Sequence, residues 1–146
     1  MSKYARYDTL SKNYDQARSA FNTDLYLGAF LTRQAKPLGE LRVLDAGCGT
    51  GNYGLAVLEA GVRHVTFLDA SEGMLGMAKE KTKHISDTRV KYIQHSLPTL
   101  PFEEESFDVV MFNNVLHHLD PNGFSELRRA VEEAYRVLRK DGILVI

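Results

Sequence analysis

Residues 43–51 read Val43-Leu44-Asp45-Ala46-Gly47-Cys48-Gly49-Thr50-Gly51. An apolar run ends in an acid and continues into three alternating glycines, after which the pattern becomes helical. Glycine lets a ligand lie against bare backbone, and the N–H groups that begin a helix favour a ligand carboxylate. Asp45 is placed to accept a hydrogen bond from a ligand ammonium group. A tight turn with a solvated acid is the alternative, but it leaves the combination of glycines and acid unexplained.

Outward from this segment, apolar strands alternate with helical stretches. The predicted strands cover residues 41–46, 63–69, 89–95, 107–112 and 143–146, and the predicted helices cover 52–60, 71–84 and 125–140. Near-continuous apolar strands separated by helices indicate a parallel sheet with both faces covered. Right-handed crossovers make such a sheet doubly wound. We therefore predict an α/β fold with three αβα layers in one domain, in which a helical segment over 1–40 precedes a core over 41–146.

A second acid, Asp69, ends the second predicted strand. Ligands of doubly wound sheets bind outside the carboxyl ends of the strands, and an acid there can accept hydrogen bonds from both ribose hydroxyls. The alternative is that Asp69 and Ser71 only begin the next helix. The glycines upstream favour the ribose interpretation.

Composition excludes several classes of protein. The chain has 146 residues, 44% hydrophobic and 25% charged, with a formal net charge of −1, so no field that holds a nucleic-acid backbone is expected. No apolar stretch reaches the roughly 18 residues of a membrane span, and no secretion signal precedes the core, so we expect a cytoplasmic protein. Cys48 is the only cysteine, which excludes an internal disulfide, and we predict no metal site.

The glycine segment and four later motifs resemble the class I S-adenosylmethionine-dependent methyltransferases, in particular their small-molecule branch. The later motifs, which occur in the family's order, are Leu68–Leu75, Leu100–Val110, Val115–Leu119 and Arg136–Gly142. The resemblance covers about residues 41–146. It implies a Rossmann-like fold, S-adenosylmethionine as cofactor with S-adenosylhomocysteine as product, and methyl transfer to a small molecule by in-line displacement.

The resemblance also assigns residues to the parts of the cofactor. The methionine end would be held by Gly47, Gly49 and Gly51, the ribose by Asp69, and the adenine would lie near Ala70 and Met74. Where the family usually has an adenine-binding Asp, this chain has Ser96, whose hydroxyl accepts a hydrogen bond without bringing a charge. The backbone N–H of Leu97 would remain as a second contact. We therefore expect a modest affinity for the cofactor.

Other candidates follow the fourth predicted strand or precede the first. Asn113 would meet the methionine end through its backbone carbonyl, or else Asn113 and Asn114 are turn residues. His117 and His118 are candidate general bases, although packing is the favoured interpretation.

Near the N-terminus, the tyrosines at positions 4, 7 and 14 resemble the family's lid. Tyr14 would close over the cofactor, or else the three tyrosines form an amphipathic face against the core.

Two other functions remain open. A non-catalytic S-adenosylmethionine-binding protein is the first, because family members continue past the fifth strand whereas this chain ends at Ile146. We expect a longer form of the chain, or an oligomeric partner, to cover the edge of the last strand. A nicotinamide-dependent oxidoreductase is the second, because Gly49-Thr50-Gly51-Asn52-Tyr53-Gly54 matches G-x-G-x-x-G. In that register Asp45 would lie inside the strand. The sequence also shows no second domain to carry residues for hydride transfer.

Overall fold

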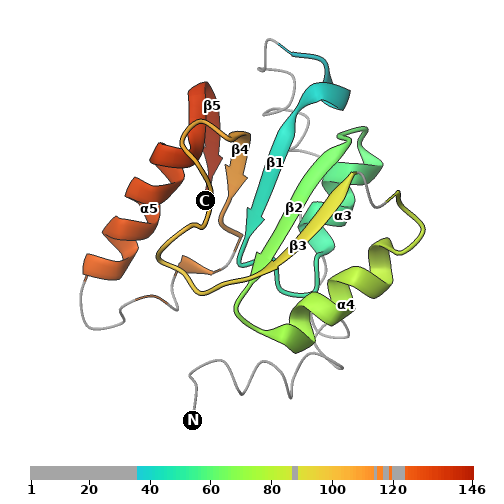
Figure 1. The fold of residues 1–146 in the computed structure, drawn as a ribbon, viewed down its shortest axis with the longest axis horizontal. Coiled ribbons are helices and arrows are strands. Elements are labelled where there is room, and N and C mark those ends of the chain that lie inside the picture. The colour runs from blue at the N-terminus through green and yellow to red at the C-terminus, as the bar shows by residue number, and fades with distance from the viewer. Residues whose placement is uncertain (1–35, 87–88, 114, 117–118, 120–123) are drawn as a thin grey trace.

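A computed structural model describes residues 36–86, 89–113, 115–116, 119 and 124–146. A short 3₁₀ helix, η1 (Leu38–Glu40), precedes the first strand. The strands are β1 (Arg42–Ala46), β2 (His64–Asp69), β3 (Val90–Gln94), β4 (Phe107–Met111) and β5 (Leu138–Val145), and the α-helices are α3 (Asn52–Glu59), α4 (Glu72–Thr82) and α5 (Ser125–Val137). The strands form one parallel sheet in the order β3-β2-β1-β4-β5 (Figure 1). The strand order reverses between β1 and β4, which is where ligands bind in such sheets.

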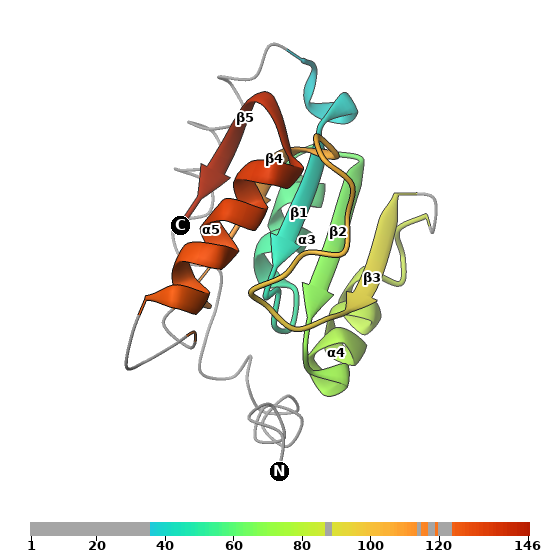
Figure 2. The ribbon, with the colours of Figure 1, turned by 60° about the vertical axis from the view of Figure 1, so that its left-hand side comes forward.

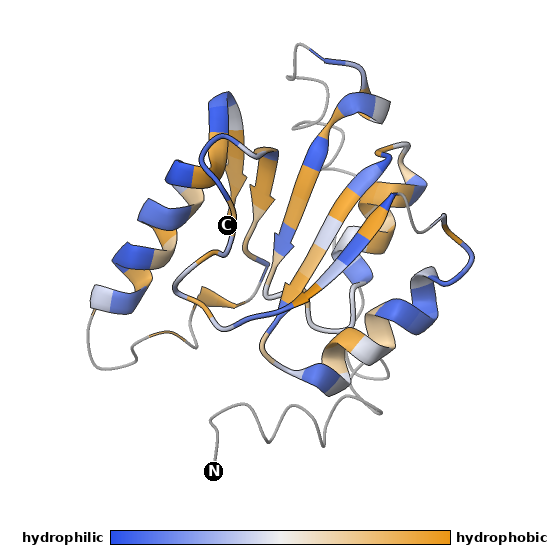
Figure 3. Cartoon of the chain, viewed as in Figure 1, coloured by the Kyte–Doolittle hydropathy of each residue, from blue (hydrophilic) through white to orange (hydrophobic). Residues whose placement is uncertain are grey.

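The sheet is covered on both faces, which confirms the predicted doubly wound αβα fold. Helices α3 and α4 lie on one face and α5 lies on the other (Figure 2). One buried cluster includes Val43, Val57 and Phe67, and the other includes Leu44 and Ala134. Apolar residues are concentrated in the strands and on the helix sides that face them (Figure 3). Such burial is the main source of stability for a domain of this size.

Local signals in the sequence explain where the helices begin and end. Helix α3 begins after Gly51, whose φ is +86°, and is followed by Gly61 at φ +117°, both in the region that favours glycine. Helix α4 begins after Ser71, whose side-chain oxygen accepts a hydrogen bond from the Met74 N–H at 3.2 Å. Among the described residues, no helix is both long and apolar enough to cross a membrane.

The predicted boundary between the last helix and the last strand is wrong. The helix was expected to reach residue 140 but ends at Val137, and β5 begins at Leu138 instead of residue 143. The backbone of Leu138 pairs with Phe107 of β4, which places Leu138 in the sheet. The register shifts between Phe107 and Val109, near Asp141, which has φ +67°. Strand β5 thus contains a local irregularity, after which Ile143 pairs with Val109.

A buried carboxylate, Asp108, connects β1, β4 and β5 at the end of the sheet opposite the glycine loop. Asp108, which is 4% exposed, accepts hydrogen bonds at 2.9 Å from the Arg42 N–H and from the Lys36 ammonium. The Arg139 guanidinium lies 3.7 Å from the same carboxylate. A buried charge that is paired and hydrogen-bonded in this way does not carry the cost of an isolated one. It fixes the strands at the end remote from the glycine loop.

Helix α5 also holds the loop that returns from β3 to β4. Arg136 donates hydrogen bonds to the carbonyls of Leu100 and Phe102, at 3.0 and 2.8 Å. Glu133 accepts from the Leu100 N–H at 2.8 Å and pairs with Arg136, which lowers the pKa of its carboxyl to about 2. The loop that carries Leu97 is therefore anchored to a helix.

Candidate functional site

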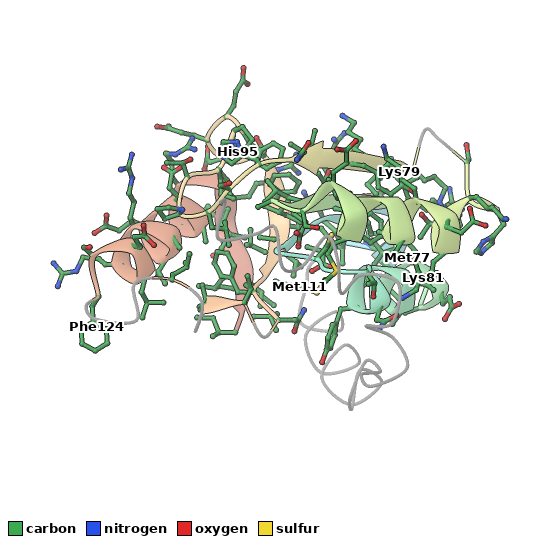
Figure 4. The ribbon with its side chains drawn as sticks, turned by 90° about the horizontal axis from the view of Figure 1, so that it is seen from below. Met77, Lys79, Lys81, His95, Met111 and Phe124 are labelled. Carbon is green, nitrogen blue, oxygen red and sulfur yellow. The ribbon has the colours of Figure 1, made fainter. Side chains whose placement is uncertain are left out.

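The candidate site lies at the carboxyl ends of β1, β2 and β3, which Figure 4 views from below. The loop after β1 contains the three alternating glycines, whose φ angles are +71° at Gly47, +55° at Gly49 and +86° at Gly51. A Cβ atom at Gly47 would come within 2.4 Å of the Val115 side chain. The loop therefore needs glycine for its backbone angles and, at Gly47, also for lack of space.

The loop is tied to the neighbouring strand before any ligand is considered. The N–H groups of Gly47 and Cys48 both donate to the Leu68 carbonyl of β2, at 2.7 and 2.9 Å. These bonds continue the pairing of β1 with β2 beyond the last strand residue. They hold the loop against the end of β2, where Asp69 stands.

Asp69 contacts the glycine loop directly. One carboxylate oxygen, Oδ2, accepts a hydrogen bond from the Gly49 N–H at 2.8 Å, and Oδ1 accepts from the Ser71 N–H at 2.9 Å. The structure thus brings together the loop and the acid that the sequence predicted to face one ligand. The bond to Ser71 also supports the alternative interpretation, in which Asp69 helps to begin α4. A carboxylate oxygen accepts more than one hydrogen bond, so these contacts are compatible with ligand binding.

Asp45, at the end of β1, is a buried acid whose two oxygens differ. The residue is 1% exposed, and its Oδ2 accepts a hydrogen bond from the Gly54 N–H at 3.0 Å. Its Oδ1 has no hydrogen-bond partner within the part of the chain that the structure describes. Burial raises the pKa of Asp45 to about 7, the Gly54 hydrogen bond opposes that rise, and the negative charge of Asp69 adds to it. A buried acceptor of this kind suits a positively charged ligand donor.

Gly54 and Lys81 belong to the site but were not predicted to do so. A Cβ atom at Gly54 would lie 2.2 Å from the Phe67 ring, so the side chain of this β2 residue packs directly against the α3 backbone. The Lys81 ammonium donates to Thr50 Oγ1 at 3.0 Å and to Asn52 Oδ1 at 2.5 Å. The spacing of G-x-G-x-x-G contained a signal for Gly54, whereas nothing local in the sequence indicated Lys81.

The residues expected near the adenine lie along the ends of β2 and β3. Ala70 follows β2 and its carbonyl accepts from the Gln94 side chain at 3.2 Å. Met74 is 2% exposed, so little of its side chain remains for contact with a ligand. Ser96 is exposed and Leu97 is buried, in the segment that follows β3. These residues thus follow the carboxyl ends of β2 and β3 along the chain.

The remaining candidates fall partly outside the described residues. Asn113 is half-buried two residues after the end of β4, on the other side of β1 from Asp69. His117, His118 and Tyr14 lie outside the described residues, as do the other N-terminal tyrosines and Asn114. Cys48 is buried, and burial together with the charges of Asp45 and Asp69 raises the pKa of its thiol. A thiol whose thiolate is disfavoured in this way is a poor nucleophile.

Residues 44–146 match the family described as "Methyltransferase domain". A demethylmenaquinone methyltransferase of Clavibacter sepedonicus is 33% identical over 145 residues, which are 97% of this chain and 56% of that protein. The solved structure of the YcgJ protein of Bacillus subtilis aligns with a TM-score of 0.68 at 31% identity, over 84% of this chain and 47% of that one.

A third relative is an S-adenosylmethionine-dependent methyltransferase of Mesorhizobium loti. Its structure aligns with a TM-score of 0.65 at 27% identity, over 84% of this chain and 53% of that one. The chain thus spans about half the length of the relatives that it matches. The family match covers the sheet from β1 to β5, including the glycine loop and both acids. The chain therefore belongs to the methyltransferase domain family, which confirms the resemblance of its motifs to the class I S-adenosylmethionine-dependent methyltransferases.

Proposed function

We propose that this chain binds S-adenosylmethionine and that its protein transfers the methyl group to a small-molecule acceptor by in-line displacement. One observation carries the proposal. Two acids at the ends of adjacent strands accept hydrogen bonds from one glycine-rich segment, residues 47–54. Asp69 accepts from the Gly49 N–H, and Asp45 accepts from the Gly54 N–H. Two carboxylate acceptors are thereby fixed beside the start of α3, where an adenosyl amino acid would need them for its ribose and its ammonium group.

The donor and acceptor set of the site fits the cofactor. Asp45 Oδ1 is a buried acceptor that lacks a partner among the described residues, which suits the ammonium group of the ligand. The glycine loop and the start of α3 would bind the carboxylate, and Asp69 would bind the ribose hydroxyls. The adenine would lie near Ala70, Ser96, the backbone N–H of Leu97 and the small exposed part of Met74. Asn113 would meet the methionine end, and Tyr14 would close over the cofactor.

When bound, the cofactor supplies an activated methyl group together with its leaving group. The chain's residues then need only to orient the two reactants and exclude water. A base is required only when the acceptor atom starts protonated, and His117 or His118 is our candidate for that role. The name of the Clavibacter sepedonicus relative, a demethylmenaquinone methyltransferase, supports a small-molecule acceptor.

Titration calorimetry tests the binding half of the proposal. We expect S-adenosylhomocysteine to bind with a micromolar dissociation constant and NADH to show no saturable binding under the same conditions. Binding of NADH alone would instead support the nicotinamide register of the glycine loop. A methyl-transfer screen with S-adenosylmethionine and small acceptors then separates an enzyme from a protein that only binds the cofactor.

Replacement of Asp69 by alanine is expected to weaken the binding of S-adenosylhomocysteine by about 10- to 100-fold, because charged hydrogen bonds to the ribose are lost and only partly replaced by water. Calorimetry measures the change directly. Glu59→Ala is the matched control, since Glu59 is an exposed acid at the far end of α3. An affinity that Asp69→Ala leaves unchanged would refute the ribose assignment.

Replacement of Ser96 by aspartate is expected to tighten the binding of S-adenosylhomocysteine by about 3- to 10-fold. The new carboxylate would supply a charged acceptor for the adenine amine, and such hydrogen bonds are stronger than neutral ones. Ser86→Asp adds the same charge at another exposed serine and serves as the control in calorimetry. Weaker binding by Ser96→Asp would show that Ser96 does not face the adenine.

A further inference from the structure

Lys81 links the last turn of α4 to the glycine loop. Its ammonium donates to Thr50 Oγ1 at 3.0 Å and to Asn52 Oδ1 at 2.5 Å, so it bridges the loop and the first residue of α3. Figure 4 shows Lys81 where α4 passes α3. Thr50 is 1% exposed, so one of these contacts is made to a buried side chain. Lys81 is therefore a structural neighbour of the loop that we assign to the methionine end of the ligand.

The same face of α4 packs against the loop one turn earlier. A Cβ atom at Gly51 would lie 2.8 Å from the Ala78 Cβ, so these two residues are in close contact. Residues three apart lie on one side of a helix, which places Ala78 and Lys81 side by side. The helix begins directly after Asp69 and Ser71. Helix α4 thus touches both halves of the site, Asp69 at its first turn and the glycine loop at its last.

The charge of Lys81 also acts within the site. Asp45 and Asp69 raise the pKa of the Cys48 thiol, and the positive charge of Lys81 lowers it. Lys81 is therefore close enough to influence the electrostatics of the loop. Lys79, on the same helix, instead lies 5.6 Å above the Tyr92 ring.

We propose that Lys81 is a positioning residue, which holds the backbone between Gly49 and α3 and so sets the affinity for the amino-acid end of the ligand. This inference rests on the proposed function, because it takes the glycine loop as the site of that end. The nucleoside end has a second anchor outside the loop, since Asp69 Oδ1 is held by the Ser71 N–H while its Oδ2 accepts from the Gly49 N–H. Loss of Lys81 should therefore affect the two ends of the ligand unequally.

The test compares two ligands in calorimetry. S-adenosylhomocysteine carries the amino acid, and 5′-deoxy-5′-methylthioadenosine has the same nucleoside and a thioether but no amino acid. We expect Lys81→Met to weaken S-adenosylhomocysteine about tenfold and to change methylthioadenosine by less than twofold. Lys81→Arg, which keeps the charge and donors, should recover at least half of the loss in binding free energy. Lys79→Met should leave both affinities unchanged.

Equal losses for the two ligands, or an unchanged affinity for S-adenosylhomocysteine, would overturn the role of Lys81. Hydrogen exchange of the ligand-free chain provides a second readout that does not depend on the proposed function. We expect the amides of residues 49–54 to exchange at least fivefold faster in Lys81→Met than in Lys79→Met. If wild-type chain bound neither ligand, the proposed function would fail, and unchanged exchange in Lys81→Met would still overturn the positioning role.

Discussion

Raising the pH from 5 to 8 is expected to lower the free energy of unfolding of the ligand-free chain by on the order of 2 to 3 kcal/mol through Asp45 alone. Burial raises the pKa of this carboxyl from 3.8 to about 7 in the folded chain. Between these two values the folded chain binds more protons than the unfolded chain, so stability falls as the pH rises. The contribution is fully present below pH 3.8 and is lost above about pH 7.

Urea unfolding of wild-type chain and of Asp45→Asn at pH 5, 6, 7 and 8 measures this effect. The asparagine does not titrate, so the difference between the two proteins isolates Asp45 whatever the absolute stability of the variant. Glu133 acts in the opposite direction, because its pKa is lowered to about 2, and its contribution is lost only at more acidic pH. Parallel pH profiles for the two proteins would contradict the assignment.

Gly54→Ala is expected to destabilise the chain by about 1–3 kcal/mol, although alanine normally favours a helix over glycine. A Cβ atom there would lie 2.2 and 2.7 Å from two carbons of the Phe67 ring and 3.0 Å from Asp45 Oδ2. Helix α3 would have to move away from β2, and the hydrogen bond from Gly54 to Asp45 would lengthen. Thermal and urea unfolding both report this loss.

Gly76→Ala is the matched control for this substitution. Gly76 lies inside α4, and a Cβ atom there would meet nothing within 4 Å. The same substitution is therefore expected to stabilise the chain by about 0.5–1 kcal/mol. If Gly54→Ala and Gly76→Ala changed the free energy of unfolding in the same direction, space around Gly54 would not be the controlling factor.

The sheet and the edge that carries the candidate site were predictable because their signals are local. Apolar strands and the glycines at positions 47, 49 and 51 are visible in the sequence, and parallel pairing then places the ends of β1 and β2 together. The contact between Asp69 and Gly49 followed from that arrangement. The end of α5 could not be predicted in this way, because Leu138 fits a helical pattern and a strand equally well. Its pairing with Phe107 decides between the two.

Two features of the site depend on contacts between distant residues. Lys81 reaches Thr50 only because α4 packs beside α3, and a surface lysine in the sequence carries no sign of that contact. The burial of Asp45 likewise follows from the approach of Gly54 to β1 and β2. The sequence predicted an acid for a ligand, but its raised pKa comes from the folded surroundings.

The hydrogen bonds that Asp69 accepts from Gly49 and Ser71 have a consequence for the kinetics of ligand binding. The glycine loop loses conformational freedom when the chain folds, so a ligand that binds as proposed would not have to order it. Association should then proceed in one concentration-dependent phase without a slow rearrangement of this loop, and most differences in affinity among related ligands should reside in their residence times.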